Sequence, residues 1–238
     1  KGAIWEYLMT LANSNYEDWR LANPNEDIDN FKFSFSKMSK AGALFDMVKL
    51  ADVSKNYICR LSAEEVYEMV TDWAKENNKK LYKLLVDDEE YAKAIFAIER
   101  GNAKPRKDIS AWTDVENYVS YFYSELWDRK FDFPDNLSND DMIEILELYK
   151  QIYDENVSSD DWFPQVRDMA ETIGYAKAPK VYKKDPDSYK GHVGDVAGVI
   201  RVAATGRRNT PDLYEILQVL GKDEVMKRFD EAIESLRG

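Results

Sequence analysis

Apolar residues recur at helical spacing through most of this chain of 238 residues, and this period strongly constrains its fold. Leu213, Ile216, Leu217 and Leu220, for example, would share one face of a helix that Gly221 ends. The sequence has no alternation of strand and helix patterns of the kind that builds a βαβ unit, and no convincing internal repeat. We therefore predict an all-α fold, a helical bundle without a Rossmann core.

Helix caps and helix breakers place the individual elements. Ser62 followed by Glu65 is a capping-box pattern, which predicts a helix over residues 63–75. Two polar segments with proline, residues 13–36 and residues 131–139, are expected to be irregular. The remaining expected helices cover residues 4–12, 88–100, 114–128, 140–154, 160–174 (with Ser159, Asp160 and Asp161 as the cap region), 193–204, 210–220 and 222–236.

These breaks predict three parts, residues 1–57, 58–136 and 137–238. The chain opens on Lys1 without an initiator Met, so we expect it to come from a longer protein. Its charged residues make up 33% and its hydrophobic residues 44%, no apolar run approaches the ~20 residues that cross a bilayer, and no signal-peptide pattern occurs. With Cys59 as the one cysteine, no internal disulfide can form. A cytoplasmic protein is expected.

The net charge of −12 argues against a general nucleic-acid binder. Residues 176–208 nevertheless carry eight Lys and Arg against three Asp, a local charge of +5. An acidic body with a basic face suits a partner that is held in one place. A chance cluster on a solvated face remains the alternative.

The end of this basic segment combines a helix start with two arginines. Thr210 before Pro211 reads as an N-cap followed by proline at the first helical position. Arg207 and Arg208 precede that helix start, where free N–H groups and the helix dipole already favour phosphates or base edges. An ordinary helical hairpin with a solvated arginine pair is the alternative.

Other conspicuous residues favour structural roles. His192 has no Cys or His partner for a metal, and Cys59 reads as a small core residue. Paired acids such as Asp160 and Asp161 read as helix caps. The near-helical spacing of one aromatic set favours burial in the core over base stacking. This set consists of Trp112, Tyr118, Tyr121, Phe122, Tyr123 and Trp127.

Several separated motifs occur in a recognisable order. They are the segment 1–11, Phe45-Asp46-x-x-Lys49-Leu50 followed by Asn56-Tyr57-Ile58, Lys104-Pro105-Arg106 ahead of an aromatic helix, and the stretch from Arg201 to Lys222. In this order the chain resembles the C-terminal part of bacterial glutamyl-tRNA synthetases. The resemblance spans nearly the whole chain and implies a small stem-contact segment followed by two helical anticodon-binding subdomains.

The resemblance also implies roles for individual residues. Arg106 matches an arginine that reads the third anticodon base, and Arg201 matches one that contacts the anticodon. Thr210, Pro211 and Leu213 match a helix start that contacts the first anticodon base. A guanidinium suits such recognition because it donates two hydrogen bonds to a base edge that is unstacked in RNA. Further tRNA contacts are expected from Lys104, Arg207 and Arg208.

Lys37-Met38-Ser39-Lys40 resembles the loop that class I synthetases use on ATP, but its place argues against that role. In the family that loop precedes a helix, and the matching helix, residues 1–11, here lies ahead of the motif. We therefore expect no catalytic residue and no cofactor in this chain, while ATP and Mg²⁺ belong to a parent glutamate–tRNA ligase. The expected partner is tRNA(Glu). We expect the protein to be a monomer that binds neither DNA nor membranes.

Two other functions remain open at this point. An all-helical protein-interaction module without an RNA role would fit the acidic charge and the many aromatic residues. A complete small ATP-using enzyme would have to be built around Lys37 and Lys40, which the order of the motifs disfavours.

Overall fold

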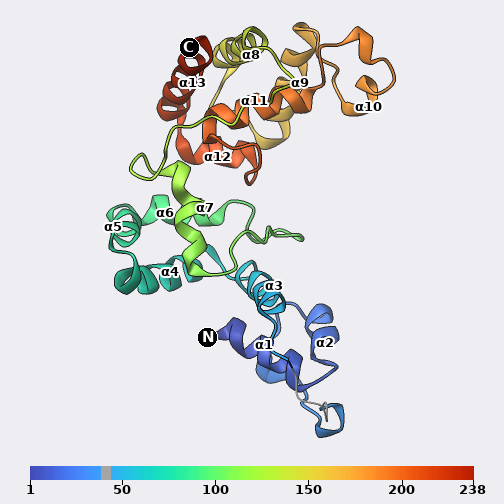
Figure 1. Cartoon of the computed structure of the whole chain (residues 1–238), viewed down its shortest axis with the longest axis vertical. Helices are drawn as coiled ribbons and strands as arrows, with labels where there is room; N and C mark the ends of the chain where they lie inside the picture. Colours follow the sequence, from blue (N-terminus) through green and yellow to red (C-terminus); the bar gives the residue numbers. More distant parts are fainter. Residues whose placement is uncertain (39–43) are drawn as a thin grey trace. The chain divides into compact units, whose positions relative to one another are not determined.

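The computed structural model describes residues 1–38 and 44–238, and in these residues the regular structure is helical (Figure 1). The described part contains no β-strand, only one isolated bridge between Ala176 and His192. The predicted all-α fold is confirmed. No helix in the described residues is long and apolar enough to cross a membrane.

The chain divides into two compact units, Lys1–Ser120 (unit 1) and Tyr121–Gly238 (unit 2). The three parts expected from the sequence have their boundaries elsewhere, after residues 57 and 136, and these boundaries stay predictions.

Unit 1 contains seven α-helices in the residues described. Within it α1 packs on α3, and α4 packs on both α5 and α6. The capping box of α4 is confirmed, since Ser62 accepts from the N–H of Glu65 and the Glu65 carboxylate accepts from the N–H of Ser62. The helices are α1 (Gly2–Ala12), α2 (Tyr16–Ala22), α3 (Met47–Ile58), α4 (Ala63–Asn77), α5 (Lys79–Asp87), α6 (Glu89–Ala97) and α7 (Val115–Val119).

The expectation of an irregular segment over residues 13–36 is wrong at α2. Its first turn carries Glu17 and Asp18, whose charges suit a helix N-terminus. Tyr16 is buried at 1% exposure and meets the ring of Phe31 edge-on at 5.0 Å. The helix therefore forms although its sequence is polar, because Tyr16 packs in an aromatic cluster with Phe31, which is distant in sequence. The helices α3 and α5 were also absent from the expected set.

Unit 2 is a helical bundle in which α8 packs on α11 and α13, α9 packs on α11, and α12 packs on α13. Its expected helices are confirmed, with shifts of a few residues at the ends, and Ser158 rather than Ser159 caps α9. The short helix α10 was not expected. The helices are α8 (Asn139–Ile152), α9 (Ser159–Thr172), α10 (Pro179–Tyr182), α11 (Val193–Thr205), α12 (Leu213–Leu220) and α13 (Lys222–Arg237).

The helix expected over residues 114–128 is much shorter than predicted. It ends as α7 at Val119, and a single 3-10 turn, Ser120–Phe122, follows. Consecutive residues on a helix point about 100° apart, so three aromatic neighbours cannot share one buried face. The chain bends instead, and Tyr121, Phe122, Tyr123 and Trp127 are all buried. The prediction that the aromatic set belongs to the core is confirmed for these four, whereas Trp112 and Tyr118 are half-buried.

Candidate nucleic-acid interface

The turn between α11 and α12 is held by one arginine, Arg201. Its Nη1 donates to the carbonyl oxygen of Pro211 at 2.6 Å and to the hydroxyl of Thr210. Thr210 and Pro211 are buried, so their oxygens need partners inside the protein, and a charged donor provides strong ones. Three of the residues selected from the sequence therefore meet at one point, where Arg201 shapes the backbone.

The N-cap of α12 is Asp212, and the prediction of Thr210 as cap is wrong. The Asp212 carboxylate accepts from a backbone N–H of the first turn at 2.9 Å, and the helix begins at Leu213. Pro211 therefore precedes the cap instead of opening the helix. The Thr210 hydroxyl is bound by Arg201 and does not cap. Leu213 is buried at 2% exposure, so it supports the turn from within.

A glycine lets α11 end where it does. Gly206 is left-handed, with φ 76°, and a Cβ there would collide with the carbonyl oxygen of Lys130. Only glycine adopts this left-handed conformation without strain and lacks the Cβ that would collide. The preceding Thr205 hydroxyl accepts from the N–H of Arg207 at 3.2 Å. Thr205 and Gly206 thus set the direction in which the following arginines leave α11.

The two arginines of this turn lie at the surface against the same unit. The guanidinium of Arg207 lies 5.4 Å from the ring centre of Tyr121, at cation–π distance. Arg208 is about half exposed, and its Nε donates to the carbonyl oxygen of Asp132 at 2.9 Å. Its Nη2 also lies 3.1 Å from the Asp132 carboxylate. Both side chains lie where RNA could reach them, while partners in the protein hold them.

A buried arginine that the sequence did not single out supports this turn from behind. Arg228 of α13 is 1% exposed and donates from Nη1 to the carbonyl oxygen of Ala204 at 2.7 Å. Its Nε donates to Glu224 at 2.8 Å, and its guanidinium lies 4.2 Å from the ring centre of Trp127. The spacing of Glu224 and Arg228, four residues on a helix, was the available signal. Nothing local shows that this pair faces the core.

Arg106 lies in unit 1, on the loop before α7. It makes a two-pronged ion pair with Asp108, Nε to Oδ2 at 2.7 Å and Nη2 to Oδ1 at 3.0 Å. The hydrogen bond to Asp108 raises the pKa of the guanidinium, and Glu99 lies 3.8 Å away. Lys104, on the same loop, is exposed. The structure therefore places Arg106 and Lys104 in one unit and the Arg201 turn in the other.

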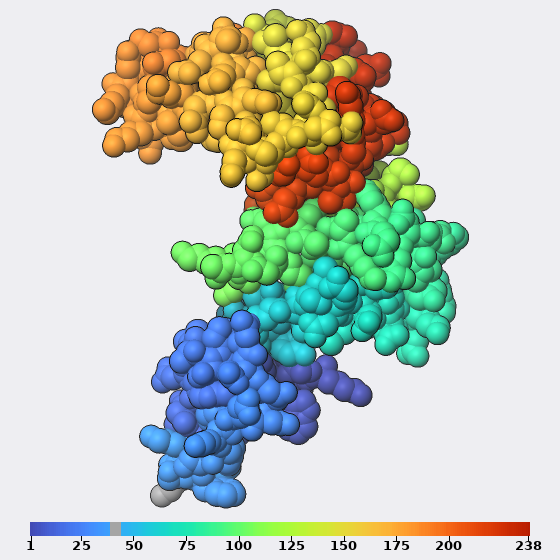
Figure 2. Space-filling model, turned by 180° about the vertical axis from the view of Figure 1, so that it is seen from behind, coloured from blue at the N-terminus to red at the C-terminus, as the bar shows by residue number. Residues whose placement is uncertain are grey.

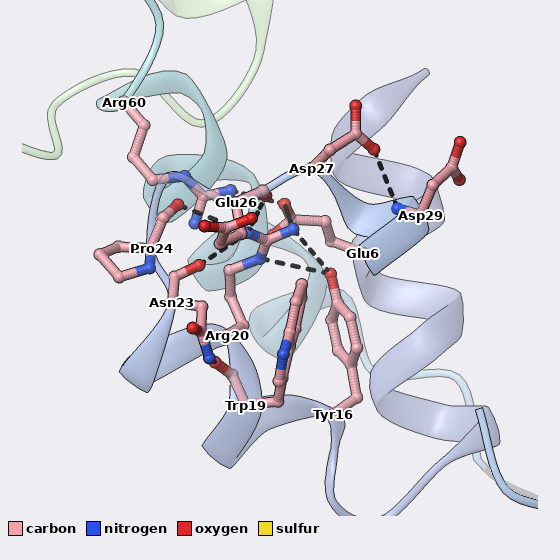
Figure 3. A network of polar contacts seen from close by, with 10 residues as sticks. All are labelled: Glu6, Tyr16, Trp19, Arg20, Asn23, Pro24, Glu26, Asp27, Asp29 and Arg60. Atoms are coloured by element: carbon pink, nitrogen blue, oxygen red, sulfur yellow. Dashed lines mark hydrogen bonds and ion pairs between the residues drawn. The ribbon is translucent and has the colours of Figure 1, made fainter. Parts of the chain in front are cut away.

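A polar network lies in the segment expected to contact an RNA stem (Figure 3). Glu6 of α1 is 5% exposed, and one of its oxygens lies 3.1 Å from Arg20 and 2.5 Å from Arg60. Arg20 also donates to the carbonyl oxygen of Glu26 at 2.6 Å and lies over the ring of Trp19. The network borders a cleft of about 240 Å³. Its polar groups bind one another and join α1, α2 and the turn that follows α3.

Only part of the motif that resembles the ATP loop, Lys37-Met38-Ser39-Lys40, lies in the described residues. Lys37 ends a 3-10 turn and is exposed, and its carbonyl oxygen accepts from the N–H of Ser14 at 3.1 Å. Lys40 lies outside the described residues. His192 caps α11, with Nδ1 accepting from the N–H of Gly194 at 3.0 Å, so its expected structural role is confirmed. In the described residues no three His, Cys, Asp or Glu side chains gather as metal ligands.

Comparison with known proteins adds to this geometry. Residues 187–233 match the model of the anticodon binding domain, and they contain Arg201 and the whole turn. The chain is 43% identical to a glutamate–tRNA ligase of Acetivibrio thermocellus over 97% of its length, and 43% identical to one of Clostridium perfringens over 95%. It spans 42% of the length of each of these relatives.

Over nearly its whole length the chain is thus similar to the glutamate–tRNA ligases. A glutamate–tRNA ligase structure from Elizabethkingia meningosepticum has the same fold, with a TM-score of 0.55 at 20% identity. The match covers 86% of this chain and 36% of that one. The turn built by Arg201 lies inside the matched anticodon binding domain.

Proposed function

We propose that this chain is the part of a glutamate–tRNA ligase that recognises tRNA(Glu) by its anticodon. The observation that carries the proposal is the position of the Arg201 turn inside the matched anticodon binding domain. The turn is rigid because buried backbone oxygens and a buried glycine contact define it. A rigid turn suits base recognition, since little conformational entropy is lost when the base binds.

In this proposal the turn supplies shape and the exposed arginines supply contacts. Thr210, Pro211 and Leu213 are buried, so they act on the first anticodon base mainly by holding the backbone and the α12 start in place. Arg207 and Arg208 lie at the surface of the same turn, within reach of phosphates. Arg201 positions the turn through its bonds to Thr210 and Pro211.

Arg106 would act differently: its guanidinium would give up its hydrogen bonds to Asp108 and donate them to a base instead. It already has the planar two-pronged geometry that a base edge with two acceptors requires. The correct base replaces both hydrogen bonds that Asp108 gives up, and a wrong base leaves one of them unmade. This difference provides discrimination of about 1–3 kcal/mol, by analogy with base recognition in DNA.

We propose that the chain by itself catalyses nothing and holds neither ATP nor Mg²⁺. Glutamylation would use parts of the ligase that lie outside the 42% of the relatives' length spanned here. The chain would work as a monomer in the cytoplasm and would bind no DNA. An ATP–pyrophosphate exchange assay with glutamate checks the catalytic part: we expect no exchange, and exchange above background would contradict it.

The central test is a fluorescence-anisotropy titration with unmodified tRNA(Glu), at two salt concentrations. The competitors are tRNA(Gln) and a tRNA(Glu) with a swapped anticodon. We expect salt-sensitive binding that weakens when the anticodon is swapped. Arg106→Gln should reduce the preference for the native anticodon by about 1–3 kcal/mol. Binding that ignores the anticodon, or no binding at low salt, would refute the proposed function.

A further inference from the structure

A loop around α10 projects from the helical bundle of unit 2, and its two ends meet at a closed base. The N–H of Ala176 donates to the carbonyl oxygen of Gly191 at 2.9 Å, and the N–H of Val193 donates to that of Ala176 at 2.8 Å. The N–H of Lys190 donates to the carbonyl oxygen of Gly174 at 3.0 Å. Residues 177–189 therefore form an excursion with a fixed base. It lies at the outer margin of unit 2, shown in orange (Figures 1 and 2).

The excursion is ordered internally as well as at its base. The N–H of Lys183 donates to the carbonyl oxygen of Pro179 at 3.0 Å, which completes the turn of α10. Tyr182 meets the ring of His192 edge-on, with ring centres 5.8 Å apart. His192 is itself fixed as the cap of α11. The loop is thus a short structured arm.

Exposed lysines cover this arm, and we call them the lysine surface: Lys177, Lys180, Lys183 and Lys184. Lys180 lies in α10, and Lys183 and Lys184 follow it three and four residues further on, a spacing that places side chains on one side of a helical turn. None of the four forms an ion pair or a side-chain hydrogen bond within the described part of the chain. Lys190, at the base, differs because it is paired with Asp141 and Glu144.

Exposed lysines without an ion pair occur elsewhere in the described residues, as at Lys32 and Lys104, but in this arm four of them lie within eight residues of the sequence. The chain has 45 Asp and Glu against 33 Lys and Arg, yet four neighbouring ammonium groups lie in water without a carboxylate. Asp185 and Asp187 follow in sequence, and the Asp185 carboxylate accepts from Ser188 at 2.7 Å. Residues 177–187 keep a charge of +2 in a protein of −12. Such a positive area attracts a polyanion that the remaining surface repels.

We propose that the lysine surface binds the phosphate backbone of a double-helical RNA stem, as a contact separate from anticodon recognition. The proposal rests on the proposed function, because that function brings a folded RNA to unit 2. Lysine suits this role as a mobile point charge with three donors, and it reads no base. An RNA helix is bound largely through its shape, its phosphates and its 2′-hydroxyl groups. The arm would add affinity and orientation to a turn that supplies selectivity.

The test is a triple variant, Lys180→Gln, Lys183→Gln and Lys184→Gln, measured with tRNA(Glu) by fluorescence anisotropy across a salt series. The matched control is Lys75→Gln, Lys79→Gln and Lys83→Gln, three exposed lysines of unit 1 with the same total charge change. Circular dichroism verifies that both variants remain folded. Every titration is repeated with the anticodon-swapped RNA.

We expect the α10 variant to bind at least about tenfold more weakly at 0.1 M salt. The slope of log K against log salt should fall by about 0.7–0.9 for each phosphate that a lysine no longer neutralises. The ratio of affinities for the native and swapped anticodons should stay unchanged, and the control should bind as the wild type does.

Three results would overturn the lysine surface while leaving the proposed function intact. The α10 variant could bind with wild-type affinity and salt slope. Both variants could weaken equally, which would indicate a general charge effect. The α10 variant could lose its anticodon preference, which would mean that the lysines act through the turn. If the wild-type protein itself binds no tRNA(Glu) at low salt, the proposed function fails and this proposal fails with it.

Discussion

Arg201 on α11 donates a hydrogen bond to the carbonyl oxygen of Pro211 at 2.6 Å, across the turn that joins α11 to α12. The same guanidinium nitrogen also binds the hydroxyl of Thr210. A charged side chain of a helix therefore fixes the backbone that precedes the next helix. Arg201 therefore positions the turn, and its replacement should measurably lower the stability of the folded protein.

Arg201→Met should destabilise the protein by about 1.5–3 kcal/mol, the usual loss for a hydrogen bond from a charged donor to buried acceptors. Urea unfolding monitored by circular dichroism measures this change. Arg208→Met is the matched control, because Arg208 lies on the same turn but is half exposed, and we expect a change below about 1 kcal/mol. Equal effects of the two substitutions would show that Arg201 does not hold the turn.

Gly198 of α11 and Gly206, which caps the C-terminus of that helix, should respond to alanine in opposite directions. Gly206→Ala forces an alanine into a left-handed conformation and against the carbonyl oxygen of Lys130, so it should cost more than about 1 kcal/mol. Gly198→Ala places a methyl group in open space inside a helix and should stabilise by about 0.5–1 kcal/mol. Thermal unfolding of both variants gives the two signs. A stabilising Gly206→Ala would contradict the described turn.

The burial of Arg228 predicts a large difference between neighbouring positions. Arg228→Met removes the donor to the Ala204 carbonyl oxygen and the ion pair with Glu224, and should cost about 1.5–3 kcal/mol. Lys227→Met removes an exposed partner of the same Glu224, 3.6 Å away, and should cost less than about 1 kcal/mol. The comparison uses urea unfolding at neutral pH. A Lys227 effect as large as that of Arg228 would contradict the buried role.

The ion pair between Asp141 and Lys190 predicts part of the stability profile in acid. The hydrogen bond from Lys190, with a second from Ser138, lowers the pKa of the Asp141 carboxyl. A lowered pKa stabilises the fold above the unfolded value of about 3.9, and that contribution disappears as the pH falls through the folded pKa. Because both groups are partly exposed, its size is below about 1 kcal/mol.

Asp141→Asn should therefore lower stability at pH 7 and make the loss of stability below pH 5 shallower. Asp140→Asn is the control, since Asp140 shares the first turn of α8 and makes no ion pair within the described residues. Unfolding midpoints in urea from pH 7 to pH 3 test the pair. An unchanged pH profile in Asp141→Asn would refute the contribution.

Much of the helical fold was predictable because helix caps and apolar periodicity act over a few residues. The capping box at Ser62 and the glycine at the end of α12 are examples of such local signals. The helix α2 was missed because its stability comes from the contact of Tyr16 with Phe31, which lies outside the helix. The long aromatic helix was wrong because burial of three successive rings required a bend.

The residues of the candidate site were available from motif resemblance, whereas their roles required tertiary contacts. Thr210 looks like a helix cap when only neighbouring residues are considered, but Arg201 binds its hydroxyl and Asp212 takes over the cap. In the sequence, Arg228 showed only its four-residue spacing from Glu224, which does not indicate a functional site. It is part of the site because α13 packs on α11 and brings its guanidinium to the carbonyl oxygen of Ala204.

By itself, then, the sequence determined the helical class, most helix positions and the resemblance that points to RNA, since each depends on local spacing or on an ordered set of motifs. Only the tertiary structure decided which charged groups are bound to partners inside the protein and which remain in water. Arg201 and Arg228 satisfy buried carbonyl oxygens, while Lys180, Lys183 and Lys184 face solvent on an arm closed at its base. Spacing along the chain cannot separate these cases, because burial and pairing depend on side chains that folding brings together.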